Sequence, residues 1–272
     1  MSTSTDASGN SAFWNELCGT TLARSLGVTD SSPTSLQRFD DWYFKFYPYL
    51  ERHIPFSALS GRRVLEVGLG YGSVSQRLAE RGAIYQGLDI ASGPVEMVNH
   101  RFRQRGLAGG ARQGSILNCP FGDESFDYVV AIGCYHHTGD LERAIRETRR
   151  VLRPGGGATI MVYSAYSYRR WIRWPGPTLS YFLWDKLKIG GPRRASDSER
   201  AAYDADSSGA AAPETVFVSA SHIRRMAADW SRVDIIRENI GDEFPLSMLP
   251  RDIKLSILGP WSGLDLYCRM AK

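Results

Sequence analysis

The chain has 272 residues, 43% of them hydrophobic, which is enough to bury one elaborated domain or a domain with a small cap. Its net charge of +4 is too small to indicate nucleic-acid binding unless the basic residues cluster. The four cysteines are widely spaced and form neither a C-x-x-C pair nor a metal-ligand pattern, so we expect no metal site and a reducing, cytoplasmic environment. No signal-peptide pattern and no membrane-spanning stretch is found, which supports the same expectation.

The N-terminal part of the chain predicts a helical cap. Residues 1–10 are small and polar, and we expect a disordered tail there. Residues 11–60 predict the N-terminal helical cap, because apolar side chains recur at helical spacing. Seven aromatic side chains lie between Phe39 and Tyr49. They form either part of the core or an aromatic wall over a substrate pocket, and the sequence leaves both open.

Strand-like and helix-like segments alternate through residues 61–163. The β-rich runs cover residues 62–67, 83–90, 110–116, 126–133 and 157–164. Helical patterns cover residues 74–82, 94–106 and 141–156. This alternation predicts an α/β fold with a doubly wound, mostly parallel sheet.

The last third of the chain has a different character. Residues 164–218 predict a basic aromatic insertion or cap, in which residues 164–194 carry seven Lys or Arg against a single Asp, followed by a small, polar linker or mobile loop. Residues 219–272 predict one more helix and two strands that complete the core sheet.

Three glycines at alternate positions join the first strand to the first helix of the core. Gly68, Gly70 and Gly72 would let a ligand approach the backbone, because no Cβ stands in the way. The third glycine comes one residue too early for the dinucleotide pattern G-x-G-x-x-G, and Ser73 stands where that pattern needs Gly. Asp89 ends the second strand, where one carboxylate can bind both hydroxyls of a ribose. These features favour an adenosine-type ligand without a pyrophosphate site.

From Arg63 to Val162 the chain resembles the class I S-adenosylmethionine-dependent methyltransferases, in particular the methyltransferase type 11-like group. The resemblance lies in VLEVGLGYG, LDIA, QGSILNCPFGDESFDYVVAIGCYHH and RETRRVLRPGG, which follow in the family's order. It implies a seven-stranded Rossmann-like sheet with a helical, aromatic cap. It also implies S-adenosyl-L-methionine as cofactor and S-adenosyl-L-homocysteine as product.

The resemblance assigns cofactor-binding roles along this core. Residues near the first strand would hold the amino-acid end, namely Glu66, Gly68, Gly70, Tyr71 and Gly72. Asp89 would bind the ribose, and Ile90 would pack on adenine. Ser115 and Ile116 stand where the family often has Asp and a small residue, so the contact to the adenine amino group departs from the pattern. Gly133 to Tyr135 would border the sulfonium and the methyl group.

His136 and His137 follow the fourth strand, where the methyl group would lie. A histidine with a pKa near its ordinary value of about 6.5 suits a general base for a hydroxyl or ammonium acceptor. A structural role in the loop is the alternative for either ring.

The basic aromatic segment is where we expect the methyl acceptor to bind. Candidate substrate-binding residues are Tyr135, Tyr166, Arg169, Arg170 and Arg173. The arginines, beside tryptophans, suit a carboxylate or phosphate on an apolar body. RNA, a membrane surface, and a solvated helix with buried tryptophans are the other interpretations.

We therefore expect an enzyme that methylates O, N or C of a small or medium-sized metabolite in specialised metabolism. The alternatives are an anionic lipid-like acceptor such as a prenyl diphosphate, RNA, or a cofactor-binding module without turnover. We expect a monomer or homodimer with a small-molecule acceptor and no nucleic-acid partner, and transient contact with a membrane surface stays open.

Overall fold

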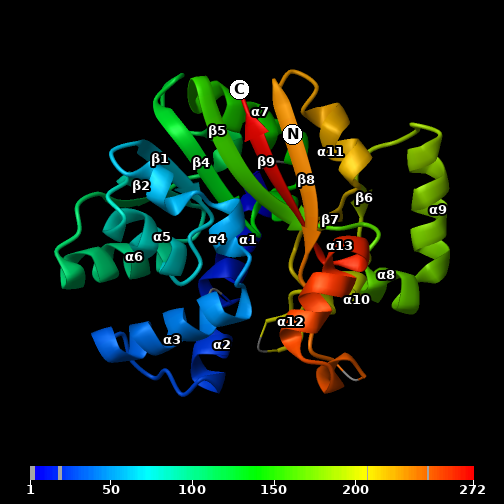
Figure 1. Ribbon diagram of the computed structural model, residues 1–272, viewed down its shortest axis with the longest axis horizontal. Helices are drawn as coiled ribbons and strands as arrows, with labels where there is room; N and C mark the ends of the chain where they lie inside the picture. The colour runs from blue at the N-terminus through cyan, green and yellow to red at the C-terminus, as the bar shows by residue number, and fades with distance from the viewer. Residues whose placement is uncertain (1–3, 18–19, 207, 244) are drawn as a thin grey trace.

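A seven-stranded sheet runs through the centre of the computed structural model, which describes residues 4–17, 20–206, 208–243 and 245–272 (Figure 1). The strand order is β3-β2-β1-β4-β5-β9-β8. The strands are β1 Arg63–Val67, β2 Ile84–Asp89, β3 Gly110–Gln113, β4 Phe126–Ile132, β5 Leu152–Tyr163, β8 Arg232–Glu238 and β9 Asp265–Ala271. The first five are parallel, whereas β9 pairs antiparallel with both β5 and β8. The predicted α/β, mostly parallel sheet is confirmed.

Alternate residues of the central strands supply the cores on the two faces of the sheet. Val64 and Val130 pack on one face with the helices α5 and α6, and Leu65 and Val129 pack on the other with α7 and α11. This follows from the two-residue period of a strand that is covered on both sides. The four helices are α5 Ser73–Glu80, α6 Ser92–Arg105, α7 Leu141–Val151 and α11 Ala220–Met226.

Three helices of the N-terminal segment lie beyond the carboxyl ends of the parallel strands, and a fourth packs on the face of the sheet that α5 and α6 cover (Figure 1). They are α1 Ser4–Leu17, α2 Thr20–Ser25, α3 Pro33–Phe46 and α4 Leu50–His53, followed by a short 3-10 helix at Phe56–Leu59. The expected disordered tail over residues 1–10 differs from the structure, since α1 begins at Ser4. Asn10 is buried and its side-chain amide donates to the carbonyl oxygen of His137 at 2.9 Å, which attaches this helix to the core. Residues 1–3 lie outside the described residues.

The segment between β5 and α11 forms a second layer at the far edge of the sheet. It contains α8 Tyr168–Arg173, α9 Pro175–Lys186 and α10 Asp197–Ala201, and a two-stranded sheet of β6 Arg193–Arg194 and β7 Val216–Phe217. The stretch expected to be a linker or mobile loop is ordered around α10. There Ser196 and Glu199 cap each other reciprocally, and Glu199 is buried.

Between β8 and β9 lies a further helical insertion that the sequence did not predict. It consists of a 3-10 turn at Leu246–Met248, α12 Arg251–Ile253, a π-helical turn at Lys254–Leu258 and α13 Gly259–Ser262. Among the described residues no helix is long and apolar enough to cross a bilayer. The same residues hold no group of three His, Cys, Asp or Glu side chains that could bind a metal ion.

Candidate functional site

The turn between β1 and α5 keeps all three predicted glycines in the left-handed region, with φ of 76° at Gly68, 51° at Gly70 and 82° at Gly72. A Cβ on Gly68 would lie 2.5 Å from Cβ of Cys134, so close packing excludes a side chain there. Gly72 is closed in the same way by Arg101, 2.9 Å from such a Cβ. A Cβ on Gly70 would meet nothing within 4 Å, so open space for a ligand adjoins Gly70 while Gly72 serves packing.

Two cavities meet at this turn, and both are lined by Gly68, Gly70 and Ile132. The Asp89 cavity has a volume of about 420 Å³ and the aromatic cavity about 610 Å³. Most of the residues predicted to hold a cofactor are divided between them. The Asp89 cavity contains Gly68, Gly70, Asp89, Ile90, Ser115, Ile116 and Gly133, and the aromatic cavity contains Glu66, Gly68, Gly70 and Tyr71.

Asp89 is held rigidly at the carboxyl end of β2. One oxygen accepts from the backbone N–H of Leu69 at 2.7 Å and the other from that of Ala91 at 2.9 Å. Burial raises the pKa of this carboxyl, and the backbone donors act in the opposite direction. Each oxygen keeps a lone pair for a further donor, so the group can accept two hydroxyls.

Flat apolar surfaces complete the Asp89 cavity. Ile90 and Ile116 line it from the sheet side, and Trp14 lines it from α1. The Ser11 hydroxyl donates to the carbonyl oxygen of Ile90 at 3.0 Å, which places α1 beside the cavity. The Ser115 hydroxyl accepts from the N–H of Leu117 at 3.2 Å, so it already caps the short turn that follows. The contribution of Trp14 was not predicted.

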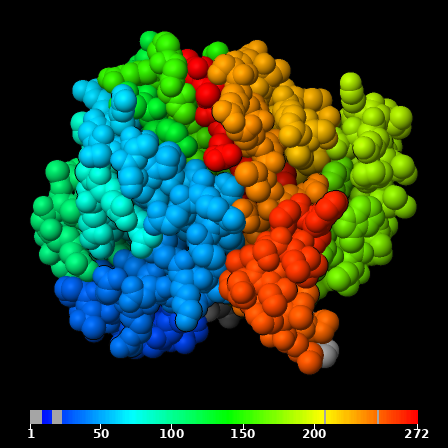
Figure 2. All heavy atoms as spheres, viewed as in Figure 1, coloured from blue at the N-terminus to red at the C-terminus, as the bar shows by residue number. Residues whose placement is uncertain are grey.

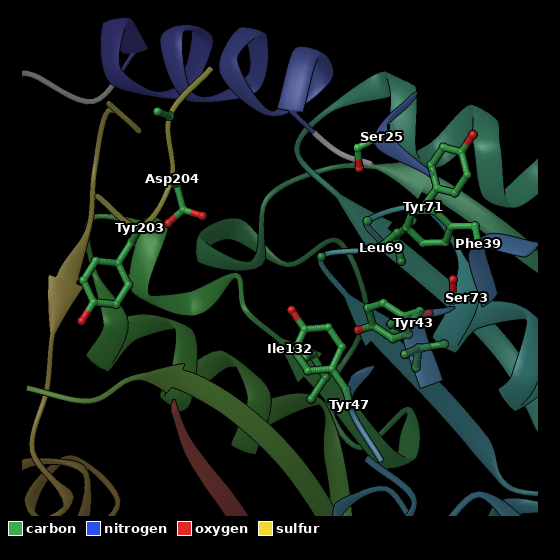
Figure 3. Close-up of a pocket in the computed structure, with 15 residues that line it drawn as sticks. Ser25, Phe39, Tyr43, Tyr47, Leu69, Tyr71, Ser73, Ile132, Tyr203 and Asp204 are labelled. Carbon is green, nitrogen blue, oxygen red and sulfur yellow. The ribbon is translucent and has the colours of Figure 1, made fainter. Parts of the chain in front are cut away.

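The aromatic cavity lies between α3 and the segment that follows α10 (Figure 3). Phe39, Tyr43 and Tyr47 form one wall, and Tyr203 and Asp204 line the opposite side. Several of the clustered N-terminal aromatics therefore line a cavity. They also pack on the core through Tyr49, which is buried, so the two alternatives left open by the sequence are both realised.

Glu66 is the buried carboxyl in the lining of the aromatic cavity. One of its oxygens accepts from the Ser75 hydroxyl at 2.5 Å and from the Tyr85 hydroxyl at 2.7 Å. Burial raises the pKa of Glu66 to about 7 in spite of these two donors. The protein therefore has a proton acceptor at the glycine turn that titrates near neutral pH.

Asp204 faces His137 and Tyr163 in a small polar cluster. One carboxylate oxygen accepts from the Tyr163 hydroxyl at 3.2 Å, and the other lies 3.5 Å from Nε2 of His137. Nδ1 of His137 donates to the carbonyl oxygen of Glu214 at 2.7 Å, which leaves Nε2 of the neutral ring as an acceptor. Burial raises the pKa of Asp204 and lowers that of His137, so the two groups can exchange one proton.

The two predicted catalytic histidines lie in different surroundings. His137 lines the Asp89 cavity and also contacts the Trp14 ring, with 4.6 Å between ring centroids. His136 is fully buried between the rings of His137 and Tyr163, each 4.0 Å away, and lines neither cavity. Burial holds the pKa of His136 well below its usual range. Of the pair, His137 lines a cavity and His136 does not.

The predicted substrate-binding tyrosines are not in the cavities. Tyr135 is buried in the core, and its hydroxyl lies 2.6 Å from that of Thr148. The Tyr166 hydroxyl donates to Asp185 at 2.9 Å. Tyr135 packs in the core and Tyr166 bonds to α9, so neither ring lines one of the two cavities.

The predicted arginine cluster also lies outside the lining of both cavities. Arg170 and Glu199 form an ion pair at 2.9 Å in which both side chains are buried. Arg169 pairs with Glu243 at 2.9 Å, and Arg173 is exposed on the surface. The charges of Arg169 and Arg170 are compensated inside the cap, and no Lys or Arg lines the described part of the aromatic cavity.

Sequence reasoning missed Tyr203 and Asp204 because they lie in a stretch of small, polar residues. Their sequence context, AAYDADSSG, resembles a loop, and its isolated Tyr-Asp pair was the one available signal.

Residues 65–160 match the family model described as a methyltransferase domain.

The chain carries a methyltransferase domain.

The resemblance noted from Arg63 to Val162, to the class I S-adenosylmethionine-dependent type, is thereby confirmed.

Curated relatives match this methyltransferase domain over part of their length. The chain is 35% identical over 104 residues to methyltransferase GfsG of Streptomyces halstedii, and the match covers 37% of each chain. It is 39% identical over 100 residues, 36% of each chain, to phthiotriol/phenolphthiotriol dimycocerosates methyltransferase 1 of Mycobacterium ulcerans. The match thus spans little more than a third of these relatives.

The fold likeness extends over most of the chain. A solved S-adenosylmethionine-dependent methyltransferase from Mesorhizobium loti aligns with a TM-score of 0.57 at 17% sequence identity. The alignment covers 83% of this chain and 97% of that one. The methyltransferase domain therefore has the class I methyltransferase fold, with the N-terminal helices and the two insertions arranged around it.

Proposed function

We propose that this protein transfers a methyl group from S-adenosyl-L-methionine to a hydroxyl of an uncharged, small or medium-sized metabolite. The proposal rests on one observation: the Asp89 cavity and the aromatic cavity meet at Gly68, Gly70 and Ile132. A donor in one cavity and an acceptor in the other would react where the two cavities adjoin. Holding the two reactants in line lowers the activation barrier of a displacement reaction, because the entropy of bringing them together is already lost on binding.

The Asp89 cavity fits the adenosine part of the cofactor. Asp89 keeps lone pairs for the two ribose hydroxyls, and Ile90, Ile116 and Trp14 offer apolar surfaces for the adenine ring. The open space at Gly70 and the carboxyl of Glu66 fit the amino-acid end. When bound, the cofactor supplies an electrophilic methyl group on a positively charged sulfur.

The aromatic cavity favours an uncharged acceptor. Its lining combines tyrosine rings with two carboxyls and, in its described part, no cation. An anionic acceptor such as a prenyl diphosphate, or RNA, would meet the Asp204 carboxyl without a compensating cation from the described lining. Tyr43 and Tyr47 instead suit a flat or apolar body.

Asp204 is our candidate for the general base. It lines the aromatic cavity, where it would accept the proton of an acceptor hydroxyl while the methyl carbon exchanges its bond to sulfur for a bond to that oxygen, and His137 can share the proton. The Asp204 side chain is already largely buried, with 15% of its surface exposed, so binding of an acceptor would remove little further water from its carboxylate. The aromatic rings around it exclude water from the reacting atoms.

The cofactor assignment is tested by calorimetric titration with S-adenosyl-L-homocysteine. We expect binding by the wild type and a loss of at least about tenfold, about 1.4 kcal/mol, in Asp89→Ala. Asp127→Ala is the matched control, since Asp127 also accepts a backbone N–H, that of Arg63 at 2.7 Å, but lies where β4 begins. Equal affinity in wild type and Asp89→Ala would contradict the ribose assignment.

The role of Asp204 is tested by turnover. Purified enzyme, S-adenosyl-L-methionine and a panel of phenols and aliphatic alcohols are incubated and screened by mass spectrometry for methylated products. With an acceptor in hand, Asp204→Asn should lower kcat by about a hundredfold or more and leave S-adenosyl-L-homocysteine affinity unchanged. The control is Asp206→Asn, because Asp206 accepts from its own turn at Ser208. Full turnover by the Asp204→Asn variant would rule out Asp204 as the general base. A wild type that binds cofactor but methylates none of these compounds would support the alternative of a cofactor-binding module without turnover.

A further inference from the structure

The α9 helix presents its apolar side to solvent. Its buried positions are Thr178, Tyr181 and Asp185, which are polar or partly polar. Leucines spaced four residues apart lie on the outer side, with exposed fractions of 49% at Leu179, 53% at Leu183 and 68% at Leu187. A helix that packs on a core ordinarily buries its apolar residues and exposes its polar ones. Packing within this fold therefore does not explain the exposed leucines.

Neighbouring residues extend this apolar stripe into a patch. We define the α8–α9 surface as the exposed large apolar side chains of this region, namely Trp171, Ile172, Leu179, Leu183, Trp184, Leu187 and Ile189. Figures 1 and 2 show α9 at the outer edge of the molecule, on the opposite side from β2 and α6. Contiguous exposed apolar surface of this kind marks an interaction site.

The charge around the α8–α9 surface is of one sign. Arg173, Lys186 and Lys188 are exposed beside it, and no ion pair is formed by any of them within the described chain. Asp185 is the single acidic residue in 164–194, and it faces inward, where it accepts from Ser221 at 2.5 Å and Arg225 at 3.0 Å. The exposed charged side chains of residues 164–194 are therefore all lysine or arginine, and they lie beside leucine, isoleucine and tryptophan.

We propose that the α8–α9 surface docks on a lipid bilayer that contains anionic phospholipids. Leucine and isoleucine would enter the acyl boundary, tryptophans would lie at headgroup level, and the three cations would pair with lipid phosphates. A twofold contact between two copies would instead bring Arg173, Lys186 and Lys188 toward their own counterparts. Exposed leucines contribute nothing to the recognition of nucleic-acid phosphates. This docking is independent of the proposed methyl transfer.

The proposal is tested by co-sedimentation with vesicles of phosphatidylcholine alone or in equal parts with phosphatidylglycerol. We expect the full chain to bind the anionic vesicles and to bind neutral vesicles at least about tenfold more weakly. Leu183→Glu should weaken binding to anionic vesicles by at least about tenfold, because it places a charge in the apolar boundary. Replacing Arg173, Lys186 and Lys188 together by Gln should remove the preference for anionic lipid.

Ile84→Glu is the matched control for Leu183→Glu. Ile84 is similarly exposed, at 58%, but begins β2 on the other side of the molecule. Equal losses in the two variants, or no binding of the wild type to anionic vesicles, would overturn the proposal. So would a concentration-dependent dimer in light scattering that Leu183→Glu dissociates, since the surface would then belong to a second copy. Thermal melting of each variant confirms that it is folded.

Discussion

Glu66 is a single buried carboxyl whose ionisation links pH to ligand binding. Its pKa is raised to about 7 from an ordinary value of 4.5, so the folded protein keeps a proton there that an unfolded chain has lost. The free energy of unfolding contributed by this group therefore falls as pH rises from 4.5 to about 7. An ammonium group bound beside it would favour the ionised form and reverse part of this loss.

We predict that affinity for S-adenosyl-L-homocysteine rises by about tenfold between about pH 6 and about pH 8, because the ionised Glu66 becomes the dominant form. Calorimetric titration across this range measures the slope. Glu66→Gln should bind more weakly at the upper pH and should lose most of the dependence. The same slope in both proteins would mean that another group, such as the ligand's own amine, controls it.

Individual residues also show where sequence reasoning reaches its limit. Asp89 and the glycines were predictable, because a strand end and a turn restrict backbone and side chain to one place. The roles of Arg170 and Tyr135 were not, because each depends on a partner distant in sequence, Glu199 for one and Thr148 for the other. The residue type alone does not show whether an arginine or a tyrosine binds another residue of the protein or a ligand.

Three helices of the N-terminal cap and the core are joined by one buried ion pair. Asp40 of α3 accepts from the Arg101 guanidinium of α6 at 2.8 and 3.1 Å, and from the Ser73 hydroxyl of α5 at 2.5 Å. Arg101 also closes the space over Gly72 at the start of α5. The cap that carries Tyr43 and Tyr47 is thus fixed to the helix that follows the glycine turn.

We predict that Asp40→Ala lowers the free energy of unfolding by about 3–5 kcal/mol, since it leaves the Arg101 charge buried without a partner. Urea denaturation followed by circular dichroism measures the change. Asp41→Ala is the control at the next position, because Asp41 is exposed and its carboxylate accepts from the Gln37 side-chain amide at 2.8 Å. We expect that control to stay within about 0.5 kcal/mol of the wild type. Equal effects at both positions would contradict a joining role for the pair.

Across the whole molecule, the regular core and the position of the 164–218 insertion were predictable, whereas the internal structure of that insertion and the insertion between β8 and β9 were not. Apolar residues such as Val64 and Leu65 alternate between the two faces of the sheet. This alternation identifies the segment as a strand, restricts its register and determines which side chains face each layer of helices. Residues 196–206 and 208–216 lack this periodicity, and their structure depends on long-range contacts such as Asp204 with Tyr163 and Glu199 with Arg170. Tyr203, Asp204 and Ala205 of that stretch line one side of the aromatic cavity, so this part of the cavity could be recognised only from the structure.

The two cavities share Gly68, Gly70 and Ile132 among the residues described, and this narrow common wall has a thermodynamic consequence. Each ligand would change the affinity for the other chiefly through contacts made across it. Such coupling is reciprocal, so whatever factor the acceptor applies to cofactor affinity, the cofactor applies to acceptor affinity. Ile132 carries the only side chain larger than a hydrogen atom among these three shared residues, so a substitution there would change the two affinities by the same coupling factor.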